Sequence, residues 1–176
     1  MIDLARTRSS LLHDIGVSNE TLVRRVEGPD DDRFLELDEA VLTVRGGTPA
    51  ELLPVLATAL SRRFSGVSKK RLRDDLLYLL KKGIGNAYKW GHDRDPERSI
   101  TVYLVVSRTG AVASVTDEGA GFDVARTVDK LLEGECYYTH GGSGFKNFRR
   151  TRSLVSYENS GRTLLIRFLD PAAARE

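Results

Sequence analysis

Cysteine and histidine are scarce in this sequence of 176 residues, and that scarcity limits the chemistry open to it. Cys136 is the only cysteine, which excludes an intramolecular disulfide and a zinc site built from thiolates. The histidines lie far apart, at His13, His92 and His140, so a structural metal site is not expected. A hydrophobic core must therefore hold the fold together, and a chain without disulfides suits the reducing cytoplasm.

The sequence also lacks a long apolar run and an excess of charge of one sign. Nowhere do the roughly 18 consecutive apolar residues of a membrane helix occur, and the N-terminal segment does not have the apolar run of a signal peptide. With 27 Lys and Arg against 25 Asp and Glu, the formal net charge is only +2. Nucleic acid is therefore not the expected partner, and neither is a membrane.

Apolar residues divide the chain into an arm, one domain and a short tail. Residues 1–33 are polar and end in the turn-forming run 28–32, residues 34–170 carry regular apolar patterns, and residues 171–176 form the tail. The arm has apolar residues at helical spacing, namely Leu4, Leu11, Leu12 and Ile15. They predict a short amphipathic helix, which is either a loosely docked extension or a contact in a homodimer.

The domain begins with a strand region followed by a helix. Residues 33–45 predict one or two strands around a tight turn. Thr48, Pro49 and Glu51 then form a capping box with proline at the first helical position, which predicts a helix ending near Phe64.

A second helix follows Ser68, because apolar residues recur every three or four positions. It carries Gly83 and Gly85, and each glycine destabilises a helix interior by about 1 kcal/mol relative to alanine. We therefore expect something to approach the helix backbone closely at these two positions.

Two hairpins and a short helix complete the pattern. Residues 133–145 show no regular apolar spacing and predict a mobile loop. The predicted elements are a hairpin over 99–117, a helix over 123–132 and a hairpin over 154–168. Strands of one sheet with helices placed between them predict a two-layer α/β sandwich, with a mixed, mostly antiparallel sheet and helices on one face.

Four short motifs follow one another along the domain, each of them weak by itself. The second helix carries Asn86-Ala87-x-Lys89, and a strand then ends in Asp117-x-Gly119-x-Gly121. A glycine loop and the Gly-x-Thr that opens the last strand follow, and their residues are Gly141, Gly142, Ser143, Gly144, Gly161 and Thr163. In this order the motifs resemble the nucleotide-binding boxes of the GHKL superfamily, and most closely its bacterial anti-sigma-factor serine kinases, over about residues 34–168.

The resemblance implies a site for ATP with Mg²⁺. Asp117 would accept a hydrogen bond from the adenine amino group, and a carboxylate, which only accepts, selects adenine over guanine. Gly119 and Gly121 would let the backbone pass close to the base. Asn86 would offer an oxygen to Mg²⁺ and Lys89 a charge to a phosphate. The resemblance also implies that the glycine loop holds the triphosphate, through Gly141, Gly142, Ser143 and Gly144. It implies that Thr163 lies near the adenine-binding aspartate.

Lys82 departs from the family pattern at a position that matters for mechanism. In the anti-sigma-factor kinases a glutamate four residues before the asparagine is the general base, and here that residue is Lys82, which cannot accept a proton when charged. The family histidine is also displaced, because Trp90 stands at its position and His92 follows two residues later. The residues therefore predict nucleotide binding and leave phosphotransfer open.

Three functions stay open at this point. The first is a cytoplasmic regulator resembling an anti-sigma-factor serine kinase with weakened phosphotransfer, whose protein partner would by resemblance be a sigma factor or an anti-sigma antagonist. The second is a nucleotide-gated protein-binding module without catalysis. The third is the catalytic domain of a two-component histidine kinase, which also lacks the glutamate, although the 30 or so residues before the domain are too few for the long helices of its substrate half.

Overall fold

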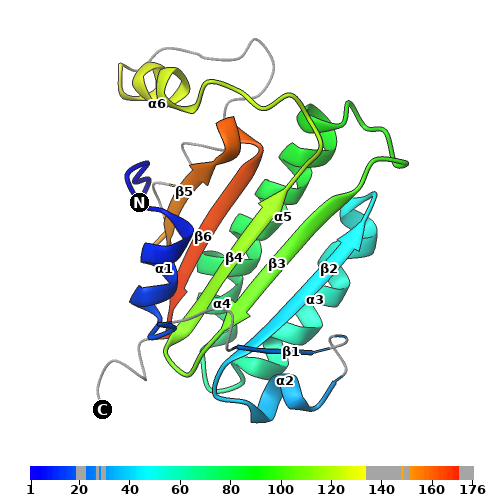
Figure 1. The fold of residues 1–176 in the computed structure, drawn as a ribbon, viewed down its shortest axis with the longest axis vertical. Helices are drawn as coiled ribbons and strands as arrows, with labels where there is room; N and C mark the ends of the chain where they lie inside the picture. The colour runs from blue at the N-terminus through cyan, green and yellow to red at the C-terminus, as the bar shows by residue number, and fades with distance from the viewer. Residues whose placement is uncertain (19–22, 27, 29–30, 134–147, 149–150, 171–176) are drawn as a thin grey trace.

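The computed structural model describes residues 1–18, 23–26, 28, 31–133, 148 and 151–170. A six-stranded sheet in the order β1-β2-β3-β4-β6-β5 organises the chain, and only β1 runs parallel to its neighbour (Figure 1). This arrangement confirms the predicted α/β sandwich and its mostly antiparallel sheet. The strands are β1 (Arg24–Arg25), β2 (Ala40–Gly46), β3 (Ile100–Val106), β4 (Gly110–Thr116), β5 (Leu154–Glu158) and β6 (Thr163–Leu169).

The long helices cover one face of this sheet, as predicted (Figure 1). Alternate residues of β3, such as Val102 and Leu104, point to them and are fully buried. The second predicted helix is a continuous helical rod of four pieces, in which one π-helical turn (η2) interrupts the α-helix and a second (η3) ends it. The helical elements are α1 (Arg8–Asp14), α2 (Arg33–Glu36), α3 (Pro49–Arg63), α4 (Lys69–Leu72), η2 (Arg73–Leu77), α5 (Tyr78–Asn86), η3 (Ala87–Gly91), α6 (Val124–Leu132) and η4 (Asn159–Gly161).

The capping box works at the start of α3 as its sequence predicts. The Thr48 hydroxyl accepts a hydrogen bond from the Glu51 amide at 3.4 Å, and the Glu51 carboxylate accepts one from the Gly47 amide at 2.8 Å. These bonds satisfy amides that the first turn of a helix leaves without partners.

The two glycines of α5 have different explanations. A Cβ on Gly83 would lie 2.5 Å from Cδ2 of Leu164 in β6, so the helix does lie very close to the sheet there. A Cβ on Gly85 would meet no described residue within 4 Å. The predicted close approach is therefore confirmed at Gly83, and among the described residues none makes it at Gly85.

The prediction of strand structure throughout residues 33–45 is wrong for its first half. Residues 33–36 form the helical turn α2, and only residues 40–46 form a strand. The reason lies far away in the sequence, because the Arg63 guanidinium donates hydrogen bonds to the carbonyl oxygens of Phe34, Leu35, Leu37 and Asp38 at 2.7–3.0 Å. One side chain thus satisfies the carbonyls that the end of a short helix leaves open.

Helix α1 of the N-terminal arm packs on the other face of the sheet (Figure 1). Leu11 and Ile15 are 0% and 1% exposed, and they lie in a second hydrophobic cluster with Val105 and Leu165 of the sheet. The predicted short helix is confirmed, but the interpretation of a loosely docked extension is wrong for it, because the sheet offers an apolar surface on this face too.

Membrane-spanning structure was also sought in the helices. Within the described ranges, none of them combines the length and the apolar character that crossing a bilayer requires.

Candidate functional site

The end of the helical rod meets the end of β4, and this meeting brings two of the predicted motifs together. The π turn η3 starts directly after Asn86 and carries Gly91 against the carboxylate of Asp117. A Cβ on Gly91 would lie 2.6 Å from Cγ of Asp117, so only glycine fits without displacing that carboxylate.

Asp117 uses one of its carboxylate oxygens to shape its own turn. Its Oδ1 accepts a hydrogen bond from the Gly119 amide at 2.7 Å, and its backbone amide donates to the Arg162 carbonyl at 3.1 Å. The side chain is only partly buried, and Oδ2 has no hydrogen-bond partner in the described part of the chain. One oxygen therefore holds the turn while the other remains available as an acceptor.

The glycines of the Asp117 motif are required by packing against other parts of the protein. A Cβ on Gly119 would lie 2.7 Å from the Gly91 carbonyl oxygen, and a Cβ on Gly121 would lie 2.2 Å from the Ser160 carbonyl oxygen. Gly121 also has a φ of +78°, which glycine adopts most easily. These contacts fix the shape of the turn without a ligand.

Phe122 anchors the far side of the same turn. Its amide donates to the Ser160 carbonyl at 2.9 Å, and its ring meets the ring of Tyr157 edge to face with centroids 5.4 Å apart. This aromatic contact fixes the turn to the β5–β6 hairpin.

Asn86 and Lys89 stand on the rod just before its contact with Asp117. Asn86 is the last residue of α5, partly exposed, and its amide group makes no hydrogen bond with any described residue. The Lys89 ammonium lies 4.3 Å from the centroid of the Trp90 ring. Since Lys89 belongs to the π turn, its direction relative to Asn86 differs from that in a regular α-helix.

Lys82 points away from Asn86. Its ammonium lies 5.5 Å from the centroid of the Tyr78 ring, one turn towards the start of α5. This direction follows from helix geometry, because side chains lean towards the helix N-terminus. Among the described residues no carboxylate pairs with it.

The Thr163 side chain interacts with Thr116 and Asn159 and not with Asp117. It stands opposite Thr116 in the β4–β6 register, their hydroxyl oxygens are 3.1 Å apart, and the Asn159 side-chain amide donates to the Thr163 hydroxyl at 2.9 Å. The connection to Asp117 runs through the backbone of Arg162, the residue before Thr163.

Two residues that belong to none of the motifs fasten the rod to the Asp117 turn. His92 is 1% exposed, and its Nε2 accepts a hydrogen bond from the Glu118 amide at 3.0 Å. The Arg98 guanidinium donates to the Gly91 carbonyl at 3.1 Å and to the Glu118 carbonyl. The sequence marks His92 only as a displaced family histidine, and it gives no signal for Arg98, which a loop brings back to the site.

Parts of the predicted site lie outside the described residues. They are Gly141, Gly142, Ser143 and Gly144 of the glycine loop, with all of the predicted mobile loop after Glu133, and the same holds for the tail 171–176. In the ranges that the structure covers, no group of three or more His, Cys, Asp or Glu side chains could hold a metal ion. The unpartnered Asn86 amide fits a Mg²⁺ that a nucleotide would bring with it, since Mg²⁺ prefers oxygen ligands and keeps several waters.

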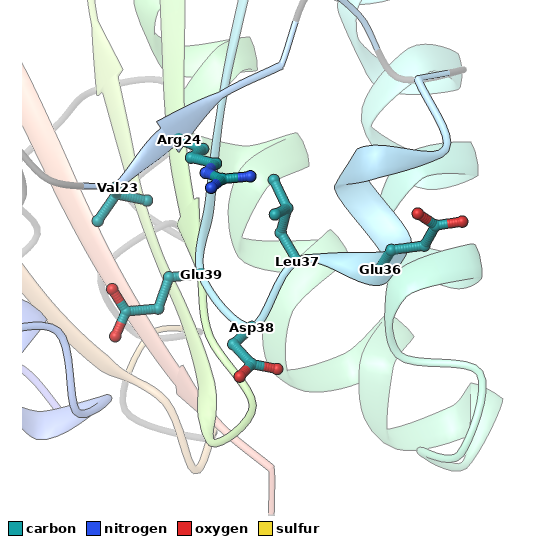
Figure 2. Close-up of a pocket in the computed structure, with 6 residues that line it drawn as sticks. All are labelled: Val23, Arg24, Glu36, Leu37, Asp38 and Glu39. Carbon is teal, nitrogen blue, oxygen red and sulfur yellow. The ribbon is translucent and has the colours of Figure 1, made fainter.

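A separate hollow lies at the opposite end of the sheet, between β1, α2 and the start of β2 (Figure 2). It has a volume of about 440 Å³ and is lined by Val23, Arg24, Glu36, Leu37, Asp38 and Glu39. The Asp38 carboxylate is paired with Arg108 at 2.7 Å. None of the predicted motifs falls on this hollow.

Comparison with known proteins adds no assignment to this geometry. A scan against protein-family models finds no match to the chain, and a search of curated proteins finds no significant match. The GHKL resemblance therefore rests on the order and placement of the motifs and stays a prediction.

Proposed function

We propose that this chain binds ATP with Mg²⁺ where the helical rod meets the Asp117 turn. The observation that carries the proposal is the packing of Gly91 against the Asp117 carboxylate. This contact brings the helix end that follows the Asn86 motif against the Asp117 motif, although Asn86 and Asp117 are 31 positions apart in the sequence. Asp117 also has a second carboxylate oxygen without a hydrogen-bond partner among the described residues, which suits an acceptor for the adenine amino group.

The charges of the rod suit the phosphate end of such a nucleotide. Asn86 would hold Mg²⁺ through its amide oxygen, and Lys89 would approach a phosphate once its ammonium leaves the Trp90 ring. By resemblance the loop containing Gly141, Gly142, Ser143 and Gly144 would enclose the triphosphate.

In the cell, the protein would act as a cytoplasmic regulator similar to an anti-sigma-factor serine kinase. Its partner would be a sigma factor or an anti-sigma antagonist. A nucleotide-gated binding module without catalysis is the second candidate, and Lys82 favours it, because a lysine at the position of the general base supplies no proton acceptor.

Calorimetric titration with ATP in the presence and absence of Mg²⁺ tests binding. We expect Asp117→Asn to weaken ATP binding more than tenfold, because a hydrogen bond to a charged group contributes about 1.5–3 kcal/mol. Asp38→Asn is the matched control, since it removes the same charge at the distant hollow and should leave ATP affinity unchanged. Equal ATP affinity of a folded Asp117→Asn variant and the wild type would rule out this site.

A second experiment separates the two candidate functions. The protein is incubated with labelled ATP and candidate sigma-factor or antagonist proteins, and the label is followed on protein and in free ADP. Label on a partner supports the kinase, whereas nucleotide-dependent association without any label transfer supports the binding module.

A further inference from the structure

The hydrogen bond to His92 defines which of its ring nitrogens carries the proton. Nε2 lies 3.0 Å from the Glu118 amide nitrogen, and that amide can only donate. Nε2 must therefore be unprotonated, and the neutral ring carries its proton on Nδ1.

Packing alone does not explain a histidine at this position. His92 is 1% exposed, and within the described part of the chain its Nδ1 has no hydrogen-bond partner. A buried donor without a partner destabilises the fold, and an apolar side chain of similar size would avoid that cost. The benefit of His92 has to come from its other nitrogen, which holds Glu118.

Glu118 is held from several sides at once. Besides the bond to His92, its carbonyl accepts from Arg98 and its carboxylate accepts from the Ser99 amide at 3.3 Å. Arg98 also donates to the Gly91 carbonyl at 3.1 Å, next to His92 in the chain. These bonds fasten Glu118, which lies between Asp117 and Gly119. The hydrogen bond from the Gly119 amide to Oδ1 of Asp117 in turn orients the Asp117 carboxylate.

We propose that His92 is a positioning residue for the base end of the nucleotide site. The proposal rests on the proposed function, in that Asp117 is the group that accepts from adenine. His92 holds the Glu118 amide, and through it the turn in which the Gly119 amide orients the Asp117 carboxylate, so loss of His92 lowers ATP affinity.

The first test needs no nucleotide. Nitrogen NMR of the imidazole rings should show His92 protonated on Nδ1 at neutral pH. Amide hydrogen exchange at Glu118 should be about tenfold faster in His92→Leu and near the wild-type rate in His92→Gln, because glutamine can place an oxygen where Nε2 stood. A proton on Nε2 of neutral His92, or equal exchange in all three proteins, would overturn the proposal.

The second test uses ATP affinity measured by calorimetry. We expect His92→Leu to bind ATP about tenfold more weakly and His92→Gln to recover most of that loss. His13→Gln, at an exposed histidine of α1, should bind ATP as the wild type does.

The two tests distinguish failure of the positioning role from failure of the proposed function. Wild-type protein that binds no ATP refutes the proposed function, and the Glu118 exchange rates then still show whether His92 holds the turn. ATP binding with equal affinity in the wild type and His92→Leu refutes the positioning role while the nucleotide site stands.

Discussion

Gly91 packs against the Asp117 carboxylate of the candidate site. In Gly91→Ala the new Cβ would start 2.6 Å from the Asp117 carboxylate, which has to move. We expect the free energy of unfolding to fall by about 1–3 kcal/mol, as for other overpacked sites, and ATP affinity to fall at least tenfold because the displaced carboxylate no longer meets the base. Urea unfolding and calorimetry measure the two effects.

Gly85→Ala is the control for this experiment, since its Cβ would meet no described residue within 4 Å. Replacing a helical glycine by alanine should raise the free energy of unfolding by up to about 1 kcal/mol without changing ATP affinity. If both variants changed ATP affinity alike, the effect would come from the helix in general and not from the Gly91–Asp117 contact.

Lys82 provides a prediction about turnover. Wild-type protein should bind ATP and hydrolyse it very slowly, because a general base contributes about 10²–10⁴-fold in rate and none stands at this position. Lys82→Glu should bind ATP more weakly through loss of positive charge and gain measurable turnover, followed as ADP released with time. Fast wild-type hydrolysis that survives Lys82→Ala would mean that another residue is the base.

The residues of the site differ in how far sequence could predict them. Asp117 and Asn86 belong to short motifs whose spacing can be read directly, and the fold brings these motifs together. Arg98 acts through a guanidinium that reaches two backbone carbonyls across a loop, and such long-range contacts leave no local pattern. The same limitation hid Gly91, whose importance appears only where the rod meets the sheet.

At the scale of elements, α1 should contribute as much to stability as a core helix. Leu11 is 0% exposed in the cluster between α1 and the sheet, so Leu11→Ala should lower the free energy of unfolding by about 2–5 kcal/mol. Leu4→Ala, at a residue of the arm that is 39% exposed, should change it by less than about 0.5 kcal/mol. If Leu11→Ala and Leu4→Ala lowered the free energy of unfolding by equally small amounts in urea, the arm would not be part of the folded unit.

The elements with strong local signals are those that sequence predicted well. The capping box of α3 and the β-branched hairpin of β3 and β4 carry their own hydrogen-bonding and packing information, and both occur as predicted. The turn α2 was predicted as a strand because its stabilising partner, Arg63, lies at the end of another helix. The π turn η3 has no sequence signature in the handful of residues that form it.

At the scale of the whole molecule, one carboxylate links the arm to the sheet. Asp14 pairs with Arg6 of the arm and with Arg167 of β6, the latter at 2.5 Å. Burial by itself raises the pKa of Asp14, but the hydrogen bonds from Arg6 and Arg167 outweigh it and hold the pKa below its ordinary value of 3.8.

The sign of the resulting pH effect follows from that shift. Because the pKa is lower in the folded state, the carboxylate stabilises the fold fully above the ordinary value of 3.8, and this contribution is lost as the pH falls through the folded-state pKa. Wild-type protein should therefore lose more stability than Asp14→Asn between about pH 6 and pH 3 in urea unfolding. Parallel losses in the two proteins would show that the link contributes nothing.

The position of Trp90 gives the molecule an optical reporter of its own. It is the only tryptophan in the chain, is 56% exposed, and precedes the glycine on which the Asp117 carboxylate rests. A nucleotide phosphate that draws the Lys89 ammonium from its place 4.3 Å from the ring centroid would change the electric field on the indole and shift its emission. Each variant described above could then be followed by intrinsic fluorescence in real time, without a label, and stopped-flow mixing would give the association and dissociation rates that calorimetry does not resolve.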